Sequence, residues 1–68
     1  MVTGKVKWFN LDKGYGFIRP KGSMKNVFVH LTELQKSGID KLVEGQRVSF
    51  DTETNNGKVI AINIKSEE

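Results

Sequence analysis

Apolar and polar residues alternate with a period of two along several short stretches of this chain, and this alternation predicts β-strands. Aromatic and β-branched residues, which favour strands, dominate residues 15–19 and 27–30. The pattern predicts further strands over residues 4–10, 46–52 and 58–64. Turn-forming residues separate these segments. The clearest turn signal is Asn-Asn-Gly at residues 55–57, because these residues tolerate positive φ angles.

Residues 31–38, between the third and fourth predicted strands, favour one or two helical turns. Thr32 and Gln35 have the spacing of a capping box, and Gly38 suits the end of a helix. Five short strands and one helical turn predict an all-β fold, a five-stranded antiparallel barrel of the OB type. The side chains expected in its core are Val6, Ile18, Val27, Val29, Leu34, Val48 and Phe50.

The pattern does not decide which face of the last predicted strand points to the core. Ile60, Ile62 and Ile64 share one face of this strand, whereas Val59 and Ala61 compete for the core from the other face. The alternation alone therefore leaves the register of this strand undecided.

Alternation also gathers aromatic residues on one face of the two central strands. Tyr15 and Phe17 share a face of the second strand, and Phe28 and His30 share a face of the third. Their aliphatic neighbours take the opposite faces and suit the core. Small soluble proteins seldom expose such a patch without a partner. Rings that border lysines suit unpaired nucleobases, which stack on the rings while the lysines meet phosphates.

Positive charge is concentrated in the same part of the chain as the rings. The net charge is +3 over 68 residues, but residues 1–30 carry +5 and residues 31–68 carry −2. Residues 1–30 also hold five of the six Trp, Tyr and Phe residues. This combination favours a nucleic acid over a membrane surface as the partner.

Length and composition argue against several other classes of protein. A chain of 68 residues predicts one domain over residues 1–68, which we expect to be a monomer. With no cysteine and one histidine, we expect no disulfide, no metal site and no cofactor. No signal peptide or long apolar run is evident, which predicts a cytoplasmic protein without a membrane span. As a general base, His30 would need an oriented nucleophile or a metal, and the sequence offers no candidate for either. We therefore expect neither an enzyme nor a small-molecule substrate.

Four segments of the chain resemble the bacterial cold-shock proteins. Residues 13–18 (Lys-Gly-Tyr-Gly-Phe-Ile) and 27–30 (Val-Phe-Val-His) resemble the two ribonucleoprotein motifs of that family. Residues 4–10 and 44–50 resemble its first and fourth strands. The resemblance implies a five-stranded barrel that binds single-stranded RNA and DNA with little sequence preference. It also implies a nucleic-acid chaperone of the stress response, with roles in transcription antitermination and translation.

The resemblance and the charge pattern together predict the nucleic-acid-binding residues. Alternation turns Trp8 inward with Val6, whereas the resemblance places it outside, and a β-bulge would reconcile the two. The location of the Phe9 side chain stays undecided between the surface and the rim of the core. Gly14 and Gly16 are expected to keep their strand slim, so that bases approach closely. The predicted set is Lys7, Trp8, Phe9, Lys13, Tyr15, Phe17, Phe28, His30 and Lys58.

Three positions depart from the family pattern. Leu31 and Ile39 stand where aromatic residues are common, which predicts weaker stacking at two subsites, and Asn26 stands where aspartate is common. The loop over residues 20–26 is unusually basic, which predicts additional phosphate contacts.

Two other functions remain open at this stage. One is a barrel whose aromatic strip grips a peptide, and the other is a translation-related barrel that docks on structured ribosomal RNA. Peptide binding would be far less sensitive to salt than nucleic-acid binding.

Overall fold

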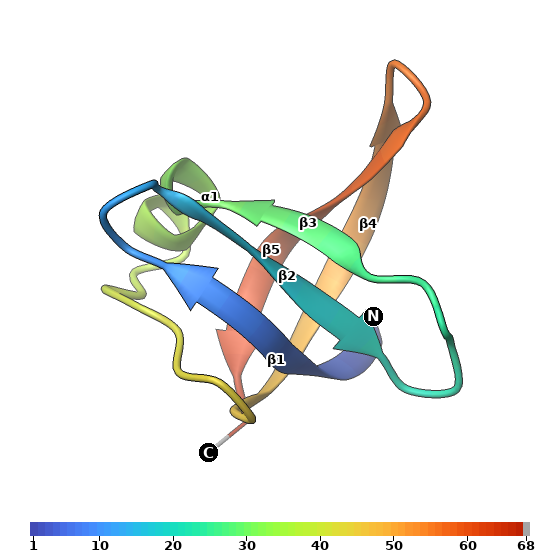
Figure 1. Cartoon of the computed structure of the whole chain (residues 1–68), viewed down its shortest axis with the longest axis horizontal. Helices are drawn as coiled ribbons and strands as arrows, with labels where there is room; N and C mark the ends of the chain where they lie inside the picture. The colour runs from blue at the N-terminus through green and yellow to red at the C-terminus, as the bar shows by residue number, and fades with distance from the viewer. Residues whose placement is uncertain (68) are drawn as a thin grey trace.

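The computed structural model describes residues 1–67 as a closed barrel of five strands with one short helix (Figure 1). The strands follow the order β1-β2-β3-β5-β4 around the barrel, and the helix lies between β3 and β4 in the chain. The predicted all-β, OB-type barrel is thereby confirmed. Its elements are β1 (Val2–Asn10), β2 (Tyr15–Pro20), β3 (Val27–His30), α1 (Leu31–Lys36), β4 (Arg47–Asn55) and β5 (Lys58–Ser66).

One strand pair of the barrel is parallel, which the sequence pattern did not predict. Strand β1 pairs antiparallel with β2 and β4, β2 with β3, and β4 with β5. Strand β3 pairs with β5 in the parallel direction. The reason is topological, because strand direction cannot alternate all the way around a closed ring with an odd number of strands.

The hairpin between β4 and β5 is longer than predicted and projects from the barrel (Figure 1). Its turn has positive φ angles at Asn56 (52°) and Gly57 (77°), as the Asn-Asn-Gly signal predicted. The end of β4 carries Glu53 and Thr54, which are exposed and show no apolar alternation. Backbone pairing with β5 extends the strand there without burial of side chains.

All seven predicted core side chains are buried, and Leu42, Ala61 and Ile64 join them. Ala61 and Ile64 are three residues apart, so strict alternation fails in β5. Asn63 causes the failure, because it adopts a φ of 51° where the pairing with β4 changes register. This bulge turns Ile64 inward and leaves Ile60 and Ile62 half-buried.

The helix α1 begins two residues earlier than the predicted capping box requires. Its N-cap is His30, whose Nδ1 accepts a hydrogen bond of 3.2 Å from the backbone N–H of Thr32. The capping-box prediction at Thr32 was therefore wrong. Leu34, at the centre of α1, is fully buried. No helix within residues 1–67 is long and apolar enough to cross a membrane.

Candidate nucleic-acid interface

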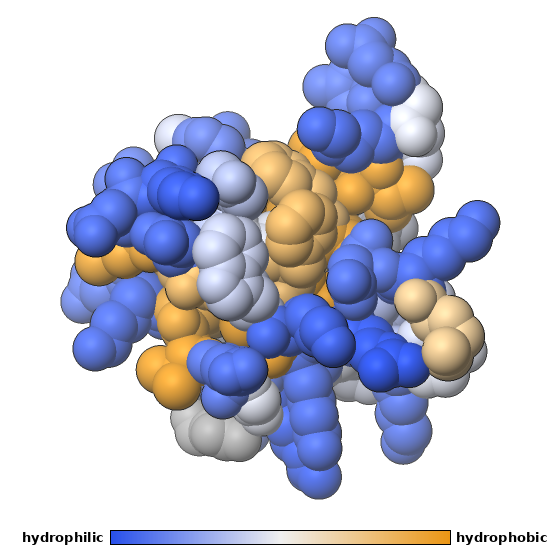
Figure 2. Space-filling view, in the orientation of Figure 1, coloured by the Kyte–Doolittle hydropathy of each residue, from blue (hydrophilic) through white to orange (hydrophobic). Residues whose placement is uncertain are grey.

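Five rings form a continuous layer on the outside of β1, β2 and β3, which we name the aromatic surface. None of the five is buried: Trp8 is 38% exposed, His30 is exposed, and the others are half-buried. Figure 2 shows pale and orange side chains at the centre of this face, with hydrophilic side chains around them. The aromatic surface consists of Trp8, Tyr15, Phe17, Phe28 and His30.

Strand register places these rings side by side. Phe17 pairs with Phe28 across β2 and β3, and Tyr15 pairs with His30. Ring centroids lie 5.9 Å apart for Phe17 and Phe28, and 5.8 Å apart for Tyr15 and Phe28. A pair of aromatic rings at such a distance gains ~0.5–1.5 kcal/mol from its contact. The rings are therefore held in place before any ligand binds.

A β-bulge brings Trp8 to the aromatic surface. The pairing of β1 with β2 runs from Val6 opposite Ile18 directly to Trp8 opposite Phe17, which leaves Lys7 without a partner on β2. Val6 is 2% exposed, whereas Trp8 faces outward and stacks with Phe17 at 6.3 Å. The bulge expected from the conflict between alternation and resemblance is confirmed.

Phe9, by contrast, does not join the aromatic surface. It is half-buried and packs against the core from the barrel rim. No ring contact within residues 1–67 connects it to Trp8, Tyr15 or Phe17. The structure therefore separates Phe9 from the other predicted aromatic residues.

The predicted lysines are all exposed, and one of them contacts the aromatic surface directly. The Nζ atom of Lys58 lies 5.1 Å from the ring centroid of Phe28, a cation–π contact. Lys7 and Lys13 are exposed, and no residue within 1–67 forms an ion pair with either. Lys25, in the loop between β2 and β3, lines a groove with Phe17, Phe28 and Lys58. The basic loop was the sequence signal for Lys25.

Gly16 has a different role from the one predicted. A Cβ atom at this position would overlap the carbonyl oxygen of Trp8 and would lie 2.6 Å from Cδ1 of Phe9. Gly16 is buried against β1, so its missing side chain makes room for that strand rather than for a base. The expectation that Gly16 lets bases approach was wrong in this respect.

His30 belongs both to the aromatic surface and to the cap of α1. Because its Nδ1 accepts the hydrogen bond from Thr32, the proton of the neutral ring is assigned to Nε2. Position 30 therefore couples the start of α1 to the edge of the aromatic surface.

Two substitutions at His30 separate these roles. His30→Ala is expected to lower the free energy of unfolding by about 1 kcal/mol, because the cap is lost, and to weaken binding of a single-stranded oligomer. His30→Asn retains a good capping side chain, so it is expected to keep the stability but still lose affinity. Urea unfolding and fluorescence titration of both variants measure the two effects. Full affinity in His30→Asn would show that the ring itself does not bind.

Comparison with known proteins identifies a family model and several relatives that match most of this chain. Residues 2–67 match the family model described as the 'Cold-shock' DNA-binding domain. The chain is 47% identical over 64 residues to cold shock-like protein CspA of Rickettsia bellii, covering 94% of this chain and 91% of that protein. It is 44% identical over 68 residues to cold shock protein CspA of Rhizobium meliloti, covering 97% and 99%.

A third relative is cold shock-like protein CspE of Escherichia coli, with 51% identity over 57 residues that cover 84% of this chain and 81% of that protein. The match to the family model spans the strands that carry the aromatic surface. The chain therefore belongs to the cold-shock domain family, whose members are nucleic-acid binders and not enzymes.

Proposed function

We propose that this protein binds single-stranded RNA and DNA with little sequence preference and acts as a nucleic-acid chaperone. The observation that carries the proposal is the aromatic surface, with ring contacts across three adjacent strands and no ring buried. Lys25 and Lys58 share a groove with Phe17 and Phe28, and the exposed Lys7 and Lys13 lie close in the chain to Trp8 and Tyr15.

Stacking on rings selects single strands over duplexes. A base within a duplex already stacks on its neighbours, so its flat face is not available to Phe17 or Phe28. Every base has such a face, and stacking on aromatic side chains is therefore tolerant of sequence. Each stacked base contributes ~1–3 kcal/mol to affinity.

Chaperone activity follows from this selectivity without a nucleotide fuel. A protein that binds only open strands shifts the equilibrium between hairpin and open strand by mass action. Weak contacts spread over several rings allow the strand to dissociate again. We infer that this activity keeps messages unstructured, and that it supports translation and transcription antitermination.

Titration of the protein with a thymine-rich oligomer tests the binding proposal through the fluorescence of Trp8. Affinity for the single strand is expected to exceed affinity for a duplex of the same sequence at least tenfold. With four lysines on phosphates, log affinity is expected to fall with log salt with a slope of about −3, since each neutralised phosphate contributes roughly −0.7.

Two results would count against this proposal. Equal affinity for duplex and single strand would remove stacking as the basis of binding, and a slope near zero would favour a peptide ligand. An RNA hairpin with a fluorophore and a quencher at its ends provides the chaperone arm. Saturating protein should open this hairpin without ATP, and a hairpin that stays closed would limit the function to binding.

A further inference from the structure

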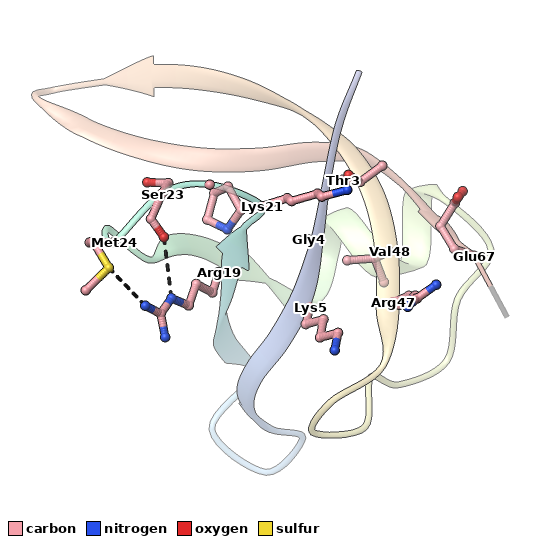
Figure 3. A pocket seen from close by; sticks show the side chains of 12 residues that line it. Thr3, Gly4, Lys5, Arg19, Lys21, Ser23, Met24, Arg47, Val48 and Glu67 are labelled. Atoms are coloured by element: carbon pink, nitrogen blue, oxygen red, sulfur yellow. Dashed lines mark hydrogen bonds between the residues drawn. The ribbon is translucent and has the colours of Figure 1, made fainter.

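We propose that a second groove beside the aromatic surface, rich in cations and without rings, holds the sugar-phosphate backbone of the same strand where it leaves the rings. This inference rests on the proposed function and extends it. The groove lies at the end of the barrel formed by β1, β2, β4 and the loop after β2 (Figure 3). We name it the basic groove, after its cationic residues Lys5, Arg19, Lys21 and Arg47.

Strand pairing aligns three of these cations in a row. Lys5 is the direct partner of Arg19 across β1 and β2, and of Arg47 across β1 and β4. Direct partners point to the same side of a sheet, and adjacent strands lie about 4.8 Å apart. All three side chains are exposed, and Figure 3 shows them on three neighbouring strands.

No ion pair within residues 1–67 neutralises a cation of this row. Ion pairs within residues 1–67 join Met1 to Asp51 and Lys36 to Glu33, and none includes a cation of the basic groove. The carboxylate that lines the groove belongs to Glu67, and it accepts a hydrogen bond of 3.1 Å from Ser49. Like charges on directly opposite positions are destabilising, so an external anion would relieve a cost that no ion pair of residues 1–67 offsets.

The basic groove is continuous with the aromatic surface. Arg19 follows Phe17 by two residues on β2 and therefore lies on the same outer face. Pro20 and Ser23 line both the basic groove and the groove that contains Phe17 and Phe28. A strand that passes Phe17 along β2 thus reaches the cations without a gap.

The chemistry of the basic groove suits phosphodiesters rather than bases. No aromatic side chain lines it, so it offers bases nothing to stack on. Arg19 is held by its own loop, because Nε donates to the carbonyl oxygen of Ser23 at 3.4 Å and Nη2 lies 3.1 Å from Sδ of Met24. A guanidinium positioned in this way favours bidentate contact with phosphate oxygens. We therefore expect recognition that depends on strand length and not on sequence.

Oligothymidylates of about six and about twelve nucleotides test the inference, since single barrels of this type occupy roughly 4–16 nucleotides. The double variant Arg19→Gln/Arg47→Gln is expected to lose about fivefold in affinity for the long oligomer, the effect of two exposed ion pairs. Its salt slope for the long oligomer should become about 1.4 less steep. Affinity for the short oligomer should stay within twofold of the unmodified protein.

Two matched variants complete the design. Arg47→Gln alone leaves the loop contacts of Arg19 in place and should show about half of the slope change. Lys36→Gln also removes one positive charge, but from α1, where Lys36 pairs with Glu33 and does not line the groove. This variant should change the affinity for both oligomers equally. At low salt, both groove variants should unfold at or above the midpoint of the unmodified protein, because like charges are removed.

The outcomes separate this inference from the proposed function. If the unmodified protein fails to bind the short oligomer, the proposed function itself is wrong. If it binds the short oligomer but Arg19→Gln/Arg47→Gln keeps the full affinity and salt slope for the long one, only the basic groove is wrong. Equal losses for both lengths, or a loss of stability that matches the loss of binding, would also overturn the inference.

Discussion

Replacement of both Phe17 and Phe28 by alanine is expected to lower the affinity for a single-stranded pyrimidine oligomer roughly thirtyfold, while the barrel stays folded. Each ring that stacks on a base is worth ~1–3 kcal/mol. The two ring centroids lie 5.9 Å apart, so the rings support each other and their single effects will not add fully. Each single variant is expected to lose about tenfold.

The fold of the double variant should survive because neither ring belongs to the buried core. Phe17 and Phe28 are half-buried, and the buried side of their strands is filled by Ile18, Val27 and Val29. Far-UV circular dichroism and thermal unfolding verify the fold, and fluorescence titration measures the affinity. Val43→Ala, which truncates an apolar side chain that is 57% exposed, serves as the control. If the double variant binds like this control, the aromatic surface is not the binding site.

The parts of the site that the sequence predicted depend on local information. Alternation in β2 and β3 needs no partner strand to place Tyr15 and Phe17 on one face and Phe28 and His30 on one face. Two such faces become one surface as soon as the strands form a hairpin, which the polar loop between them indicated. The single conflict, at Trp8, could be resolved by a bulge because only a local shift of register was required.

The parts that the sequence did not predict depend on which strands meet. Asn63 breaks the alternation of β5 where its pairing with β4 changes register, and neither strand shows this alone. Lys5, Arg19 and Arg47 are far apart in the chain, and only the pairing of β1 with both β2 and β4 makes them neighbours. The cap of α1 was missed for a chemical reason, because histidine is an uncommon N-cap residue and Thr32 offered a more ordinary one.

The close approach of β1 to β2 connects the fold to the aromatic surface. The bulge at Lys7 turns Trp8 outward, and directly after it β1 lies against Gly16, where no side chain intervenes. The same contact presses Phe9 against the core rim. We therefore expect this backbone contact to influence both the stability of the barrel and the position of Trp8.

Gly16→Ala is expected to destabilise the protein by roughly 2–4 kcal/mol. The added Cβ would overlap the carbonyl oxygen of Trp8 and lie 2.7 Å from Cα of Phe9, and backbone atoms cannot move aside as a flexible side chain does. For 68 residues the whole free energy of unfolding is of the order of 3–10 kcal/mol, so a large share would be lost.

Urea unfolding measures the change in the free energy of unfolding. Gly22→Ala is the control, since it meets no atom within 4 Å and carries only the cost of its φ of 78°, about 1–2 kcal/mol. A Gly16→Ala protein as stable as this control would show that β1 and β2 are not packed this tightly, and that the position of Trp8 has another cause.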